Sequence, residues 1–229
     1  EELAPDCEDI EAALRRVNRA IDRSYRATNP DAYNENGTFK KGCRLVPSKR
    51  CQKLKEKRKE LFRKQAAVRK QSHEKAANEL IAQSTDIKVE DTAVTSWTAR
   101  TKEASVNPKN GKIRSKKRFG KTVTRRAPAM LLAIIDRKLK YRGCALKRVV
   151  TQKVKASQFD HSTGQYRKKR LCDRWCVIDG HRVQRDLYSA FLICHVTGKN
   201  LDTIDRKACC DDWMNFLKLQ DEVLKTCDK

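Results

Sequence analysis

The sequence has no apolar run that approaches the roughly 18 residues of a membrane-spanning helix, and no membrane partner is expected. Its first residues, Glu-Glu-Leu-Ala-Pro-Asp, are acidic and differ from a secretory signal peptide. It contains no internal repeat, no glycine-rich phosphate loop and no Ser-His-Asp or Cys-His arrangement that stands out. No motif therefore points to a membrane protein or to an enzyme with a covalent nucleophile.

Acidic residues are in the minority. The 229 residues include 53 Lys and Arg against 29 Asp and Glu, which gives a formal net charge of +24. A charge this positive implies a polyanionic partner. Nucleic acid is the first choice, and it is preferred to an anionic membrane surface, the second choice on charge alone. Hydrophobic residues make up 38%, enough for a modest core in one domain, with or without a long extension.

The ten cysteines are scattered along a lysine-rich chain, which argues against a disulfide scaffold and fits the reduced thiols of a cytosolic protein. Cys172 and Cys176 form the one Cys-x₃-Cys pair, and His161 and His181 flank it. Structural zinc sites prefer two tight ligand pairs. Free thiols are therefore the favoured interpretation of these cysteines, and zinc is the weaker one.

Two helices are predicted in the first third of the chain. Apolar residues at helical spacing predict an amphipathic helix over residues 8–27, which Asn29-Pro30 ends. A much longer helical pattern opens at Pro47-Ser48 and runs to about Gln83. We expect the two helices to form an antiparallel hairpin.

The long helix is exceptionally basic, with twelve Lys or Arg against three Glu between Lys49 and Lys75. One interpretation is a solvated charged helix; the favoured one is a helix that lies along a phosphate backbone and releases counterions. The candidate nucleic-acid-binding residues are Lys49, Arg50, Lys53, Lys57, Arg58, Arg63 and Arg69 in this helix, Arg114, Lys116, Lys117 and Arg118 in the loop that follows, and Arg185.

The rest of the chain alternates short strands with helices. The predicted elements are a strand over 86–91, a long basic loop over 92–126, an apolar helix over 129–141, a strand over 145–151, a polar segment over 155–170 and a helix over 206–225. Loops as long as 92–126 are usually functional or disordered.

The stretch Val183–Ile193 predicts a helix with Asp186 in its first turn. Leu187, Ala190, Phe191 and Cys194 recur at helical spacing and predict its apolar stripe. A carboxylate at this place most often caps the helix. A metal ligand is the alternative.

Glu90, near the end of the strand 86–91, is a second candidate ligand that folding could bring to Asp186. Mg²⁺ and Mn²⁺ prefer such oxygen ligands. Two-metal phosphodiester cleavage normally takes three or four carboxylates. Asp91 points to the opposite face of the strand and is the weaker candidate.

Several segments together resemble the insertion-sequence OrfB transposon proteins, the TnpB family, which is related to type V CRISPR nucleases. Four matches carry the resemblance. The second RuvC motif is similar to Ile87-Lys88-Val89-Glu90-Asp91, and the third is similar to Gln184-Arg185-Asp186 with Ser189-Ala190. The stretch before the zinc ribbon is similar to Lys155-Ala156-Ser157-Gln158, and the segment after the first motif is similar to Arg26–Pro30 with Asn34 and Gly37-Thr38. They span nearly the whole chain in the family's order.

The resemblance implies an α/β fold of the RNase H-like (RuvC-like) class. Residues 1–85 would be a helical hairpin inserted after the first motif, and 86–229 the nuclease core, with the basic loop 92–126 and a degenerate zinc ribbon over 157–183. It also implies RNA-guided cleavage of DNA at a two-metal site, with Glu90 and Asp186 as Mg²⁺ (or Mn²⁺) ligands. A guide RNA and a target DNA would be the partners, held by backbone contacts while base pairing reads the sequence.

The chain departs from the family pattern in three places. The first RuvC motif, with an Asp and central strands, is expected before Glu1, so we expect a longer chain, which the absent initiator Met also suggests, or another segment that supplies it. Phe159–Gly164 stands where the first Cys-x₂-Cys pair is expected, and Asp91–Val94 is unusual for the family. A nuclease-inactive RNA-guided DNA-binding protein and a generic basic RNA-binding protein are the alternatives. A cytoplasmic, prokaryotic location is expected.

Overall fold

The computed structural model describes residues 7–35, 37–100, 103, 106–108, 123, 125–170 and 172–227. It is a mixed structure of helices and short strands, as predicted at the level of α/β. The chain forms two compact units, unit 1 with Glu1–Glu79 and Thr98–Ile134, and unit 2 with Leu80–Trp97 and Ile135–Lys229. The sequence analysis places the boundary between the two parts of the chain at residue 85. In the structure, residues 98–134 instead belong to the same unit as the first helices.

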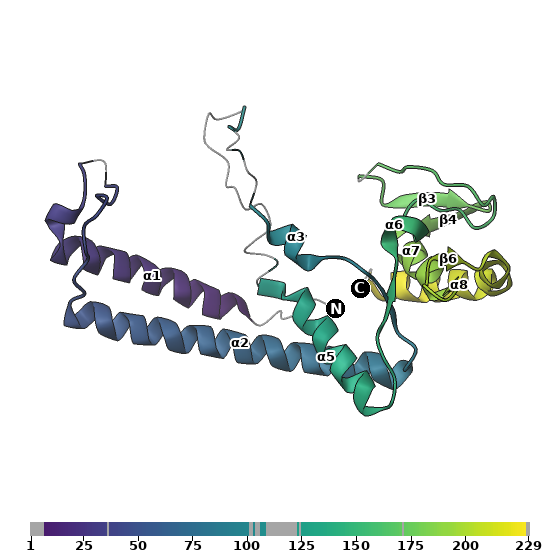
Figure 1. Ribbon diagram of the computed structural model, residues 1–229, viewed down its shortest axis with the longest axis horizontal. Coiled ribbons are helices and arrows are strands. Elements are labelled where there is room, and N and C mark those ends of the chain that lie inside the picture. Colours follow the sequence, from purple (N-terminus) through teal and green to yellow (C-terminus); the bar gives the residue numbers. More distant parts are fainter. Residues whose placement is uncertain are drawn as a thin grey trace. The chain divides into compact units, whose positions relative to one another are not determined.

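Unit 1 is built on an antiparallel helical hairpin of α1 (Glu8–Thr28) and α2 (Lys49–Gln83), which lie side by side in Figure 1. Both predicted helices are therefore confirmed, with bounds within two residues. Val17 and Ile21 of α1 pack on the buried Cys51 of α2. The seam between the helices is narrow, since most other side chains of α2 face solvent or are half-buried.

The closed end of the hairpin is fixed by polar contacts. Ser48 accepts a hydrogen bond from the Cys51 amide at 3.1 Å, which makes it the N-cap of α2, and its hydroxyl also lies 2.9 Å from that of Ser24. Asn29, after α1, bonds both the amide (2.8 Å) and the carbonyl (3.0 Å) of Val46. A short 3₁₀ helix, η2 (Pro30–Ala32), lies in the connection. These contacts explain why the chain reverses direction here.

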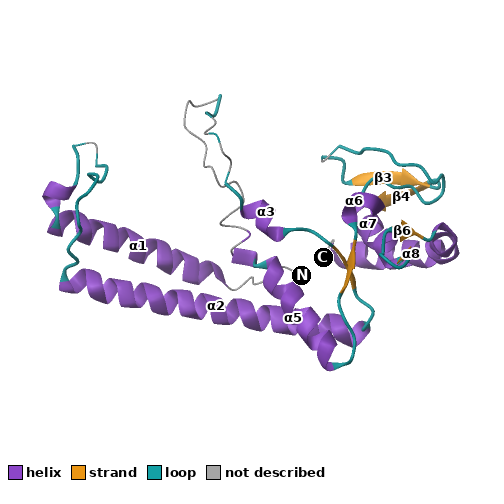
Figure 2. Ribbon diagram, viewed as in Figure 1, coloured by secondary structure: helices purple, strands orange, loops and turns teal. Residues whose placement is uncertain are grey.

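In its described residues, unit 2 contains three two-stranded sheets together with helices (Figure 2). Along the sequence, α3 and α5 each cross a boundary between the two units. In chain order the elements are β1 (Lys88–Glu90), α3 (Val94–Thr98), α5 (Pro128–Tyr141), β2 (Lys147–Val149), α6 (Thr151–Val154), β3 (Trp175–Ile178), β4 (His181–Gln184), α7 (Arg185–Cys194), β5 (Val196–Thr197), β6 (Thr203–Ile204) and α8 (Arg206–Cys227). The pair β1–β2 is parallel, and β3–β4 and β5–β6 are antiparallel.

The hairpin β3–β4 was missed by the sequence analysis, which placed Val183 and Gln184 at the start of a helix. Both residues belong to β4, and Gln184 lies opposite Trp175. The turn is Asp179-Gly180, with φ values of 48° and 74°. Positive φ at both central residues is the geometry of a type I′ hairpin turn, for which Asp-Gly is a strong sequence signal. The signal was therefore present in the sequence.

The core of unit 2 lies between α7 and α8. Tyr188, Phe191 and Leu192 of α7 are buried, and Trp213 and Phe216 of α8 pack in the same cluster. The predicted stripe on α7 is correct only in part, because Ala190 and Cys194 are exposed. The buried Tyr188 and Leu192 each follow a predicted stripe residue, Leu187 and Phe191, by one position, so the buried face is turned in one direction from the prediction.

Tyr188 also joins the segment before β3 to this core. Its hydroxyl accepts a hydrogen bond from the His161 amide at 3.0 Å and lies 2.9 Å from Nδ1 of the buried His161 ring. Arg206 of α8 donates to the carbonyls of His161 and Ser162, each at 2.9 Å. The segment that was predicted as polar and without regular structure is therefore tied to two helices.

We predict that Tyr188→Phe destabilises the chain by about 1–3 kcal/mol, because the buried His161 amide loses its acceptor. The free energy of unfolding from urea titration measures this effect. The matched control is Tyr166→Phe, since Tyr166 is 53% exposed. Equal stability of both variants would contradict the assignment of Tyr188 as the anchor.

Candidate functional site

Glu90 ends the short strand β1. It lies opposite Val149 in the parallel pair with β2, and its side chain is half-buried. The next residue, Asp91, is held by β2, because its amide donates to the Val149 carbonyl at 3.0 Å and its carboxylate pairs with Arg148 at 3.5 Å. Of the two adjacent carboxylates, Asp91 is thus already committed to a basic neighbour.

Asp186 lies in the first turn of α7, as predicted, but it is not the helix cap. The N-cap is Gln184, whose side-chain oxygen accepts a hydrogen bond from the Leu187 amide at 2.7 Å. The capping interpretation of Asp186 is therefore wrong. Its side chain keeps 58% of its surface exposed, and a carboxylate in the first turn is stabilised by the positive end of the helix dipole.

The strand of Glu90 and the helix of Asp186 contact each other within unit 2. Lys88 of β1 donates from Nζ to the carbonyls of Cys194 and Val196, at 2.6 and 2.9 Å. The start of β1 is thereby fixed at the C-terminal end of α7, and the helix then extends about 12 Å back to Asp186. Elements far apart in the sequence are thus neighbours, and these hydrogen bonds lie at the end of α7 opposite Asp186.

Two guanidinium groups compensate the charge of Asp186. Arg174 approaches one carboxylate oxygen at 3.3 Å and Arg185 the other at 3.4 Å. The Arg185 side chain is only 13% exposed and also donates to the Arg170 carbonyl at 3.2 Å. Arg185, a candidate for nucleic-acid binding, is thus directed at Asp186 instead of at solvent.

Among the described residues, no group of three or more His, Cys, Asp or Glu side chains is placed to hold one metal ion. Cys172 is exposed and lies 3.6 Å from an oxygen of Asp173, whereas the half-buried Cys176 accepts from Lys169 at 3.5 Å. His161 is buried against Tyr188. The candidate zinc ligands are therefore engaged separately.

The candidate nucleic-acid-binding residues on α2 differ in how exposed and how paired their side chains are. Lys49, Arg50, Lys53 and Lys57 are exposed, and Arg58 and Arg69 are half-buried. Arg63 is exposed but forms two hydrogen bonds with Glu60, at 2.8 and 2.7 Å, and these lower the pKa of the Glu60 carboxyl. The loop candidates Arg114, Lys116, Lys117 and Arg118 lie outside the described residues.

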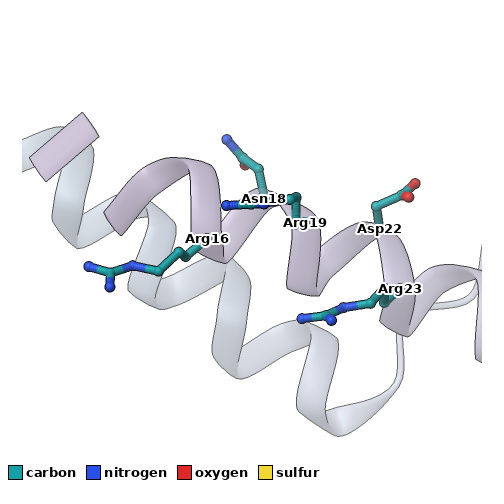
Figure 3. Close-up of a pocket in the computed structure, with 5 residues that line it drawn as sticks. All are labelled: Arg16, Asn18, Arg19, Asp22 and Arg23. Carbon is teal, nitrogen blue, oxygen red and sulfur yellow. The ribbon is translucent and has the colours of Figure 1, made fainter. Parts of the chain in front are cut away.

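The sequence analysis missed a set of arginines on α1. Arg16, Arg19 and Arg23 border an open hollow on this helix together with Asn18 and Asp22 (Figure 3). Asp22 pairs with Arg26 at 2.9 Å. The three arginines are exposed and recur at positions i, i+3 and i+7 of one helix face, a spacing that was visible in the sequence.

No protein-family model matches this chain, and a comparison with curated proteins gives no significant match. Within the part of the chain that the structure describes, no helix combines the length and apolar character needed to cross a membrane.

We predict that the chain loses stability as the pH falls below about 6.5, the ordinary pKa of histidine. Burial lowers the pKa of His161, so the unfolded chain takes up a proton before the folded chain does. His161→Asn removes this titration. The free energy of unfolding, measured at about pH 8 and about pH 5, should fall less in the variant than in the parent chain. The same fall in both would exclude His161 as the cause.

Proposed function

We propose that this chain is the RuvC-like, RNase H-like part of an RNA-guided DNA endonuclease, with Glu90 and Asp186 among its metal ligands. The observation that carries this proposal is the contact of α7 with β1. The contact joins β1, which ends with one candidate carboxylate, to α7, which has the other in its first turn, and its hydrogen bonds lie at the C-terminal end of α7. The parallel pairing of β1 with β2 supports an α/β core of this kind.

The donor set fits a hard divalent cation. Glu90 and Asp186 offer carboxylate oxygens, which Mg²⁺ and Mn²⁺ prefer. When bound, such ions activate water and stabilise the leaving oxygen in phosphodiester cleavage. A further carboxylate would come from the first-motif segment, expected before Glu1 or on another chain. Arg174 and Arg185 would have to release Asp186, or stay beside it and bind the phosphate.

Guide RNA and target DNA are the proposed partners, and the helical hairpin is their proposed binding surface. On α2, Lys49, Lys53 and Lys57 are exposed and follow one another at intervals of four residues. On α1, Arg16, Arg19 and Arg23 form a second exposed basic surface. Both suit contacts with a phosphate backbone, which require charge without base recognition. Such a function places the protein in a prokaryotic cytoplasm.

We predict that Asp186→Ala and Glu90→Ala each reduce DNA cutting at least about 100-fold and leave RNA and DNA binding intact. The assay uses a protein that contains this chain and the first-motif segment, loaded with guide RNA and Mg²⁺. Asp91→Ala is the matched control, because Asp91 pairs with Arg148 and is not a proposed ligand. It should cut like the parent protein.

The proposal fails if the parent protein leaves a matched target intact under these conditions. It also fails if Asp91→Ala removes cutting while Glu90→Ala does not, because Asp91 would then be the ligand on this strand.

The second candidate is a nuclease-inactive RNA-guided DNA-binding protein. The ion pairs of Asp186 with Arg174 and Arg185 favour it, since they neutralise a carboxylate that a metal would need. Under this alternative, the parent protein binds its target with the same affinity in Mg²⁺ and in EDTA, and no cutting appears.

We predict that replacing Lys53 and Lys57 by Gln weakens nucleic-acid binding and lowers its salt dependence. Each lost phosphate contact reduces the slope of log K against log salt by about 0.7–0.9. Binding isotherms at several salt concentrations measure the slope. Arg63→Gln is the control, because Glu60 already neutralises Arg63, and it should change the slope less. Equal effects would contradict the role assigned to the free lysines.

A further inference from the structure

The β3–β4 hairpin carries an exposed tryptophan. Trp175 keeps 39% of its surface exposed and Val177 keeps 68%. Residues that lie directly opposite in an antiparallel pair share one face, and the register sets Trp175 against Gln184 and Val177 against Arg182. One face of the hairpin is therefore made by these four side chains.

The opposite face of the hairpin belongs to the core. Ile178 and Val183 are buried in the cluster of unit 2, and Cys176 packs against it. The hairpin thus alternates regularly between a core face and a solvent face. Trp175 is outside because of its place in this alternation, and its ring lies on the solvent face.

Arg182 lies over the ring of Trp175, with its guanidinium carbon 4.5 Å from the ring centroid. This contact combines an aromatic plane with a positive charge. Proteins bind single-stranded nucleic acids with the same combination, because bases stack on aromatic rings while cations attract the backbone. The solvent face of the hairpin therefore has the chemistry of a base-stacking surface.

Two residues at this end of the hairpin contact Asp186. Gln184, opposite Trp175, donates from Nε2 to the Asp186 carboxylate at 3.4 Å. Arg174, the residue before Trp175, pairs with the same carboxylate at 3.3 Å. Trp175 therefore has two neighbours, one across the hairpin and one along the chain, whose side chains contact the Asp186 carboxylate.

The charge around the hairpin fits a polyanion. Arg167 and Lys168, shortly before β3, are exposed, and Arg182 adds its charge beside Trp175. A nucleic-acid strand therefore fits this face better than an apolar protein segment, because its phosphates pair with the cations while its bases contact the ring.

We infer that Trp175 and Arg182 form a platform on which a base of single-stranded DNA stacks beside Asp186. The inference rests on the proposed function, since the stacked strand would be the one whose phosphodiester bond reaches Asp186. It adds a substrate-positioning site that works without a metal and can be tested without cutting.

The test measures binding of a fluorescent single-stranded oligothymidylate to the 229-residue chain in EDTA, by anisotropy. Trp175→Ala should weaken binding about 5- to 100-fold, the loss expected for one stacked base. Trp175→Tyr should bind nearly as well as the parent chain. Trp97→Ala, which removes another exposed tryptophan (44%), should bind unchanged. Binding of the duplex form should be the same in all variants.

A second readout covers the case in which Trp175→Ala folds poorly. Oligothymidylate should quench the tryptophan fluorescence of the parent chain and of Trp97→Ala, but not that of Trp175→Tyr. Quenching that persists in Trp175→Tyr, or an equal loss of binding in Trp97→Ala, would overturn the platform. Tighter binding of oligouridylate than of oligothymidylate would overturn its assignment to DNA. Cutting by the full protein is measured separately, so a failed platform leaves the proposed function standing.

Discussion

Burial of Tyr188 is the constraint that sets the geometry of unit 2. An α-helix turns about 100° per residue, so side chains two positions apart point in nearly opposite directions. Because Tyr188 is fully buried, Asp186 must face solvent, and it keeps 58% of its surface exposed. The aromatic core thus determines that the candidate carboxylate is presented outward, and no strain at Asp186 itself is needed.

The same core also fixes the segment before β3, much as bound zinc fixes the loops of a zinc ribbon. Metal binding stabilises a short ribbon because the ligands link segments that are too small to form a core. Here, Phe159 and His161 are buried against the aromatic cluster of α7 and α8. Arg206 then binds two consecutive carbonyls of the segment. Burying a large apolar side chain such as that of Phe159 stabilises by about 1.5–3 kcal/mol. Together with these hydrogen bonds, it can hold the loop while Cys172 stays exposed.

Sequence periodicity was sufficient for the long helices, because α1 and α2 combine a repeated pattern with clear ends such as Asn29-Pro30 and Ser48. It could not select the buried face of α7. The series 187–190–191–194 and the set 188–191–192 both have helical spacing, and only the position of α8 decides between them. The order of Glu90 and Asp186 suggested a shared site. The ion pair of Arg174 with Asp186 depends instead on the register of β3 with β4, which the spacing of residues along the sequence does not reveal.

In the helical hairpin of unit 1, repulsion between like charges opposes the packing of apolar side chains. Lys49, Lys53 and Lys57 stand four residues apart on α2, and like charges at that spacing destabilise a helix by a few tenths of a kcal/mol per pair. The seam of Val17, Ile21 and Cys51 must offset this repulsion. A polyanion that binds the folded hairpin removes the repulsion and releases its own counterions, and it stabilises the fold by mass action. The charge that weakens the free hairpin is therefore the same charge on which the proposed binding of a polyanion depends.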